Sequence, residues 1–180
     1  MALNNSIYTF EIDSANLISA VSDNWDAFAL QNAGEEACAG RVLGRPWWDF
    51  VSGEEVRMLY VGLLQKVRRS RRSLGFPFRC DGPSVRRFMT MTIVPLPDDA
   101  ILFRSELVRE EPRNPVSLLS REAPRGRSTL RLCGWCGLIE LGQAWLDVDA
   151  AVRALRLFEV DAMPLLSHGI CPACEEQFFR

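Results

Sequence analysis

The sequence predicts an α+β fold in which an antiparallel sheet, with helices on one face, is followed by a small four-cysteine zinc-binding module. Three observations lead to this prediction. Alternating apolar residues indicate two strands before residue 23 and three strands between residues 74 and 109. An amphipathic helix separates the two groups of strands. Two Cys-x-x-Cys pairs lie beyond residue 130 of the 180-residue chain.

The first elements are a short hairpin and a short helix. Residues 7–12 and 17–22 each have the pattern of a half-buried strand, and a turn-like segment joins them. Residues 23–32 then favour a helix, with Asp23 or Asn24 as its cap.

The long helix is predicted over residues 54–69. Ser52 and Glu55 have the spacing of a capping box at its start. Its apolar residues recur along one stripe, which must pack on an apolar surface: Val56, Leu59, Tyr60, Leu63, Leu64 and Val67.

Three strands are expected after this helix, over residues 74–80, 86–96 and 100–108. Pro77 cannot donate a hydrogen bond to a neighbouring strand, so the first of the three is expected at a sheet edge. The turn-forming sequence PLPDDA connects the last two, which makes them antiparallel neighbours.

This order of elements, with GRPWWDFV leading into the long helix, resembles a PAS domain over residues 5–109. The resemblance implies a five-stranded antiparallel sheet with helices cupping one face, and a role as a sensor or interaction module in signalling. We therefore expect a PAS-like sensor domain over residues 1–110. A Pro-rich, charged linker is expected over 111–128, and a cysteine-rich module over 129–180.

The candidate metal ligands are Cys133, Cys136, Cys171 and Cys174. Zn²⁺ accepts a tetrahedral cage of four thiolates, and the two-residue spacing lets both sulfurs of one turn reach the same ion. A module of about 50 residues has a small core and commonly needs a bound metal or a disulfide for its stability. A structural zinc site is the leading interpretation, with an iron–sulfur cluster and thiol redox chemistry as alternatives.

The redox alternative depends on CGWC, which resembles the active-site motif of thioredoxin-like oxidoreductases. That motif opens a helix, whereas LIELGQAW after Gly137 reads as a strand ending at Trp145. A helix is expected over 147–158, and a second one directly after Cys174. His168, three residues before Cys171, is a candidate to replace one cysteine as a ligand or to orient a thiolate by a hydrogen bond.

The tail also resembles a C-terminal module of some bacterial PAS and response-regulator proteins, through LCGWC, Trp145 and SHGICPAC. This resemblance supports a metal site. The 34 residues between the cysteine pairs exceed the usual zinc-ribbon spacing, so we expect a knuckle, an inserted helix and a second pair that opens a terminal helix.

The ligand of a PAS-type pocket is not identified by the sequence. Flavin-adduct photosensors carry Gly-Arg-Asn-Cys where this chain has GRPWW, which argues against that photochemistry. A histidine-ligated haem is also excluded from residues 1–110, because His168 is the single histidine. Cys38 and Cys80 are interpreted as small buried hydrophobes rather than ligands. Three tryptophans are candidates for core, pocket or dimer contacts: Trp25, Trp47 and Trp48.

Composition bears on the compartment and on the partners. The chain has no apolar run long enough to cross a membrane, and its first 25 residues contain no Lys or Arg, so a cytoplasmic protein without a secretory signal is expected. The net charge is −2, and residues 132–180 hold three basic residues against seven acidic ones, which argues against nucleic-acid binding.

Together these features predict a non-catalytic bacterial signalling protein. Its PAS-like part would act as sensor or adaptor, with a homodimer through that part as a further expectation. The zinc-stapled module would dock a protein partner that carries the output function. The chain shows no catalytic triad and no nucleotide-binding fingerprint, so we expect no enzyme. A thiol-based redox switch and a nucleic-acid-binding regulator are the alternative functions.

Overall fold

A computed structural model of the chain describes residues 7–179, without the side chains of residues 178 and 179, and contains two compact units. The first unit comprises residues 7–51, 57–77 and 89–108. The second comprises residues 52–56, 78–88 and 109–179. Most of the five-stranded sheet lies in the first unit and the four-stranded sheet lies in the second, so the two are described separately.

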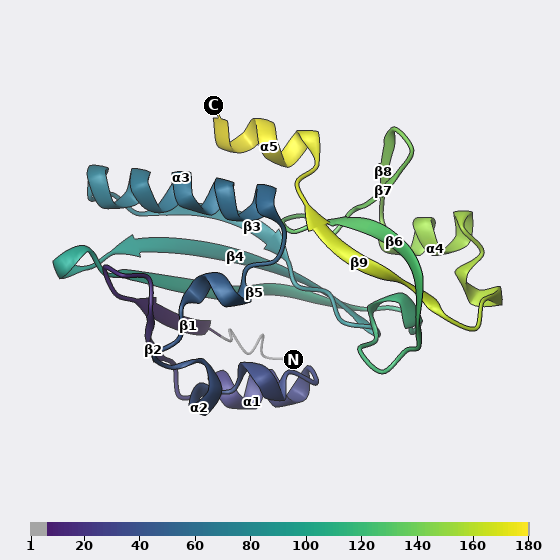
Figure 1. The fold of residues 1–180 in the computed structure, drawn as a ribbon, viewed down its shortest axis with the longest axis horizontal. Helices are drawn as coiled ribbons and strands as arrows, with labels where there is room; N and C mark the ends of the chain where they lie inside the picture. The colour runs from purple at the N-terminus through teal and green to yellow at the C-terminus, as the bar shows by residue number, and fades with distance from the viewer. Residues whose placement is uncertain (1–6, 180) are drawn as a thin grey trace. The chain divides into compact units, whose positions relative to one another are not determined.

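The larger sheet has five antiparallel strands, as the sequence predicts. Its order is β2-β1-β5-β4-β3 (Figure 1). The strands are β1 (Ile7–Ile12), β2 (Ile18–Val21), β3 (Leu74–Arg79), β4 (Val85–Pro95) and β5 (Ile101–Pro112). Pro77 lies in β3, which is an edge strand, where a residue without an N–H is tolerated.

Helices of the first unit share one face of this sheet. Phe10 of β1 and Phe103 of β5 are cross-strand partners, and their rings stack 4.4 Å apart. Trp25 contacts Phe10, with ring centroids 5.8 Å apart. Trp47 and Tyr60 contact Phe103 at 4.8 and 6.3 Å. Because Trp25, Trp47 and Tyr60 come from two helices and a 3₁₀ turn, these elements pack on the same face of the sheet, as expected.

The helices of this unit are α1 (Trp25–Gln31), α2 (Ala39–Val42) and α3 (Glu54–Ser70), with 3₁₀ turns at Glu35–Ala37, Trp47–Phe50 and Pro97–Asp99. The long helix α3 lies where the sequence predicts it. Its apolar stripe is buried at Val56, Leu59, Leu63, Leu64 and Val67. Trp47 is also buried and lies 4.8 Å from Trp48, so at least Trp47 is a core residue.

The second unit holds a four-stranded sheet in the order β8-β7-β6-β9 (Figure 1). Its strands are β6 (Arg125–Cys133), β7 (Ile139–Leu141), β8 (Ala144–Leu146) and β9 (Met163–Gly169). Strands β6 and β9 are parallel, whereas the β6–β7 and β7–β8 pairs are antiparallel. Two helices belong to this unit, α4 (Val148–Ala154) and α5 (Pro172–Phe179).

Residues 111–128, for which the sequence predicts a linker, are packed into this unit. This segment contains the 3₁₀ turn Ser117–Leu119. Val116 and Leu118 are buried in the core of the unit, and β6 already begins at Arg125. The core consists of Val116, Leu118, Ile139, Val148, Ala151, Leu157 and Met163. A segment that buries two apolar side chains is part of the fold, although its Pro residues and charges resemble a linker.

Two further elements differ from the prediction. The single strand expected to end at Trp145 is a hairpin of β7 and β8, which turns at Gly142 with a left-handed φ of 63°. The helix expected to reach residue 158 ends at Ala154, because Arg156 adopts a left-handed φ of 53° before the 3₁₀ turn Leu157–Glu159. Asp147 caps α4 by accepting a hydrogen bond from the N–H of Asp149.

Candidate metal centre

Parallel pairing of β6 with β9 brings the two cysteine pairs together. Cys133 is the last residue of β6 and lies opposite Gly169, the last residue of β9. Cys171 follows Gly169 by two residues, so it emerges beside Cys133 although 38 positions separate them in sequence. The pairing thus explains how distant cysteines converge.

The first pair lies on a tight turn after β6. The Cys133 carbonyl accepts from the N–H of Gly137 at 3.0 Å, and the Cys133 N–H donates to the Leu138 carbonyl at 2.8 Å. Gly137 closes the turn with a φ of 70°, a left-handed conformation that glycine adopts without strain. This geometry directs both sulfurs of the pair toward one point.

The second pair opens α5, as the sequence predicts. Cys171 immediately precedes the helix, and its carbonyl accepts from the N–H of Glu175 at 2.9 Å. Pro172 occupies the first helical position, where a missing N–H costs nothing. Cys174 lies in the first turn, so both sulfurs are near the end of the helix that favours negative charge.

All four sulfurs lie within 4.8 Å of one another, so the cluster could hold a metal ion. The Cys136 and Cys171 sulfurs are 3.6 Å apart, and the Cys171 N–H lies 3.4 Å from the Cys133 sulfur. Tetrahedral zinc with bonds of about 2.3 Å requires sulfurs about 3.8 Å apart. Cys133, Cys171 and Cys174 are buried, and Cys136 is half-buried. Spacing and burial both fit a closed four-sulfur site.

The pKa values of the thiols show why a cation suits this cluster. A hydrogen bond from the Cys136 side chain lowers the pKa of Cys133 to about 4. The same hydrogen bond, together with burial, raises the pKa of Cys136. Burial raises the pKa of Cys174 to about 12. Crowding therefore prevents all four sulfurs from ionising by themselves, and a divalent ion would supply the positive charge that four thiolates need.

His168 lies outside this cluster, which among the described residues consists of the four cysteines. It is half-buried on β9, opposite Leu132 of β6, and burial lowers its pKa. The structure therefore does not bring it to the metal site as a ligand. Cys38 and Cys80 also lie outside the cluster, and each is half-buried.

The first turn of α3, whose residues 54–56 belong to the second unit, supports the second cysteine pair. Oε2 of Glu55 accepts a hydrogen bond from the Ile170 N–H at 3.3 Å and also contacts the Arg131 guanidinium. Gly53 approaches His168 so closely that a Cβ would lie 2.3 Å from the His168 carbonyl oxygen. The sequence assigned Glu55 only to a capping box, and no local signal indicates a contact across 115 residues.

Arg131 links Glu55 to the hairpin of β7 and β8. Its guanidinium lies 3.3 Å from Glu140 of β7 and 5.8 Å from the ring centroid of Trp145 on β8. The side chain therefore contacts both strands of the hairpin as well as Glu55. Sequence reasoning missed this role, because Arg131 lies between apolar strand residues without any motif of its own.

In comparisons with known proteins, no family model and no curated protein matches the chain. Within residues 7–179, no helix is both long and apolar enough to cross a membrane. The fold and the site define the class to which the chain belongs: an α+β protein with a five-stranded antiparallel sheet and a four-cysteine cluster that could hold a metal ion.

Proposed function

We propose that the chain is a non-catalytic bacterial signalling protein, a PAS-like sensor or adaptor that works in the reducing cytoplasm. Its four-cysteine cluster binds structural Zn²⁺, and the folded module around it docks a protein partner that carries the output. The observation that carries the proposal is the convergence of four sulfurs within 4.8 Å at the end of a small sheet.

Zinc is the metal that this donor set favours. Four thiolates and no open coordination position are typical of structural zinc sites. The apparent free energy of such binding is about 10–16 kcal/mol at neutral pH, which exceeds the stability of most small domains. The ion would hold the ends of β6 and β9 and the start of α5 together, since these carry the four cysteines.

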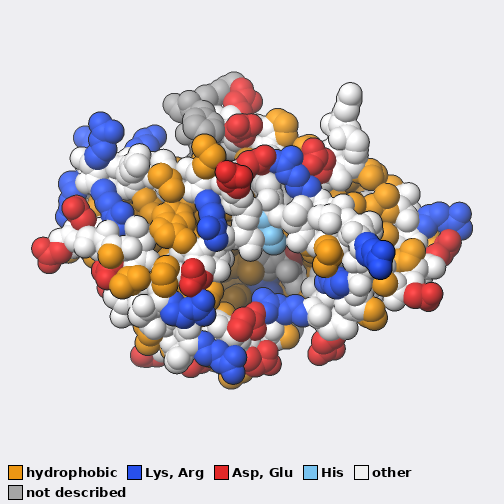
Figure 2. All heavy atoms as spheres, viewed as in Figure 1, with side chains coloured by type: hydrophobic (Ala, Val, Ile, Leu, Met, Phe, Trp, Pro, Cys, Tyr) orange, Lys and Arg blue, Asp and Glu red, His pale blue; other side chains and the backbone are white. Residues whose placement is uncertain are grey.

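A docking role is supported by the fold and by the surface. The five-stranded sheet with helices on one face is the architecture that the PAS resemblance implies. Acidic and basic side chains are interspersed on the face shown in Figure 2, rather than gathered by sign as in nucleic-acid-binding surfaces. A protein partner fits such a surface better than a polyanion does.

The proposal can be tested by cross-linking in cells. The intact chain should be cross-linked to a protein with an output domain, and Cys171→Ser should abolish that cross-link because the docking module loses its staple. Cys38→Ser is the matched control, since Cys38 lies outside the cluster. The same partner recovered equally with both variants would contradict docking through the zinc module.

A thiol-based redox switch is the second candidate, and one observation favours it. Cys136, the most accessible sulfur of the cluster, lies 3.6 Å from the Cys171 sulfur. One hydrogen peroxide molecule would oxidise these two thiolates to a disulfide, take up two protons, and leave as two water molecules while Zn²⁺ is released.

The two functions differ in their response to peroxide. A switch predicts zinc release at low peroxide doses, a Cys136–Cys171 disulfide in peptide mapping, and recovery with thiol reductant and zinc. A purely structural site predicts that zinc stays bound at doses that already oxidise Cys38. A zinc-binding dye measures the zinc that is released, and mass spectrometry of peptides measures the Cys136–Cys171 disulfide and the oxidation of Cys38.

A further inference from the structure

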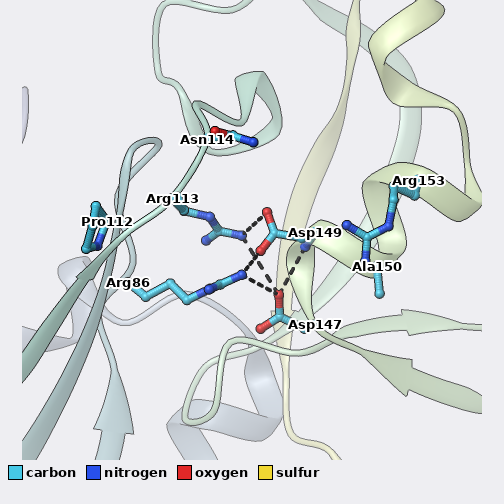
Figure 3. A pocket seen from close by; sticks show the side chains of 8 residues that line it. All are labelled: Arg86, Pro112, Arg113, Asn114, Asp147, Asp149, Ala150 and Arg153. Atoms are coloured by element: carbon cyan, nitrogen blue, oxygen red, sulfur yellow. Dashed lines mark hydrogen bonds and ion pairs between the residues drawn. The ribbon is translucent and has the colours of Figure 1, made fainter.

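A second site lies in the second unit and is built from charged side chains. It is an open pocket with a volume of about 760 Å³. It lies between β4, the end of β5 and α4, and its lining includes Arg86, Arg113, Asn114, Asp147, Asp149 and Arg153. Figure 3 shows the Arg86 and Arg113 guanidinium groups directed toward the two carboxylates. The volume lies within the usual range for small-molecule sites.

Both carboxylates of this pocket already have cationic partners. Asp149 contacts Arg86 and lies 2.9 Å from Arg113. Asp147 lies 3.8 Å from Arg86 and 3.9 Å from Arg113, and its Oδ1 also caps α4. A cationic ligand would find these oxygens occupied, so the pocket does not favour one.

The surplus charge of the pocket is positive. Its lining carries three guanidinium groups against two carboxylates. Arg153 is an exposed residue on α4, and its side chain has no ion pair or hydrogen bond with any residue between 7 and 179. Its charge is therefore available to a ligand from solution.

Unused donors also point to a missing acceptor. The Nε atoms of Arg86 and Arg113 are buried and have no hydrogen-bond partner in the part of the chain that the structure describes. The Arg113 side chain is only 1% exposed, and a buried donor without an acceptor is costly. Asn114 adds an amide to the lining. These buried guanidinium groups add positive potential beside the pocket, which favours an anion.

We propose that this pocket binds a small oxyanion, a phosphate or carboxylate group, with Arg153 as its primary contact and Arg86 and Arg113 as the supporting cations. Guanidinium groups bind such groups through paired, charge-assisted hydrogen bonds. The ion pairs with Asp147 and Asp149 hold two of the cations in place before the anion arrives. This inference is independent of the metal centre and of the signalling proposal.

The test uses the full chain with its metal bound. Inorganic phosphate and acetate are titrated separately at constant ionic strength, and binding is followed by NMR shifts and calorimetry. We expect saturable binding of at least one anion with a dissociation constant of about 1 mM or below. Phosphate alone would identify a phosphate site, acetate alone a carboxylate site, and both a general oxyanion site. Saturation by neither anion would overturn the proposal.

Two arginine substitutions test whether the anion binds in this pocket. Arg153→Gln should weaken binding about tenfold or more, because one charge-assisted contact is lost. The matched control is Arg156→Gln, since Arg156 is exposed and pairs with Glu159 at 2.7 Å outside the pocket lining. Arg156→Gln should change binding by less than about twofold. Equal effects of the two substitutions would overturn the assignment to this pocket. Both sites are exposed, so both variants should fold, which circular dichroism checks.

Discussion

Cys171→Ser should abolish metal binding and loosen the second unit while the first unit stays folded. Cys171 supplies one of four converging sulfurs, and its N–H also lies 3.4 Å from the Cys133 sulfur. A hydroxyl is a poor ligand for zinc, so the variant would lose much of a binding free energy of about 10–16 kcal/mol. The intact protein, purified under reducing conditions, should contain one equivalent of zinc and show no visible absorption, unlike an iron–sulfur protein.

Hydrogen exchange resolves this effect along the chain. In Cys171→Ser, peptides from β6 and β9 should lose protection from exchange, because these strands end at the four-cysteine cluster. Peptides from 89–95 and 101–107 should keep it, since Phe103 packs on aromatic residues of the first unit. Cys38→Ser should retain both the metal and the protection. Stoichiometric zinc in Cys171→Ser would contradict the ligand set, and equal loss of protection in both groups of peptides would show that the two units unfold together.

Asp149→Asn should destabilise the protein by about 3 kcal/mol at neutral pH. Asp149 contacts Arg86 and lies 2.9 Å from Arg113, whose side chain is 1% exposed. Removing the carboxylate leaves the buried Arg113 guanidinium with less negative charge beside it. Asp81, at 3.2 Å, remains as a partner of Arg113. Denaturant unfolding of the metal-bound protein measures the difference. Glu159→Gln is the control, because its pair with Arg156 is exposed and should contribute less than about 0.5 kcal/mol.

The difference in the free energy of unfolding between wild type and Asp149→Asn should depend on pH. Burial acts to raise the pKa of Asp149, but hydrogen bonds from Arg113 and Arg86 outweigh burial and hold it below its usual value. The contribution of this carboxylate is therefore complete above the unfolded pKa of about 3.9 and is lost as the pH falls through the lower folded value. Wild type and Asp149→Asn should differ by a constant amount from pH 8 to about pH 5 and converge only below about pH 4. Convergence that begins near neutrality would exclude this ion pair as the cause.

Much of the first unit could be predicted from the sequence because its elements are encoded locally. The stripe from Val56 to Val67 has helical spacing, and it is buried on α3. Met89, Met91 and Ile93 alternate along β4, and all three are buried. Pro77 correctly indicates an edge strand. In each case the chemical signal lies within a few residues of the structure that it specifies.

The second unit was harder to predict because its decisive contacts are distant. The motifs identified the four cysteines and the start of α5, but no local pattern announces the parallel pairing of β6 with β9. Glu55 illustrates the same limit, because its capping-box spacing is local whereas its bond to Ile170 is not. The ion pairs of Arg113 with Asp81 and Asp149 also join separate segments, and no motif in the sequence indicates them.

The parallel pairing of β6 with β9 also constrains how the chain assembles during translation. Parallel neighbours cannot be joined by a tight turn, and here the connection contains a hairpin and a helix. After residue 133 has been synthesised, 41 more residues must follow before Cys174 completes the second cysteine pair. At synthesis rates of about 5–20 residues per second, the nascent chain therefore contains only the first cysteine pair for several seconds. In that interval Cys133 and Cys136 lack the partner sulfurs of the cluster, so a four-sulfur metal site would form only late in synthesis.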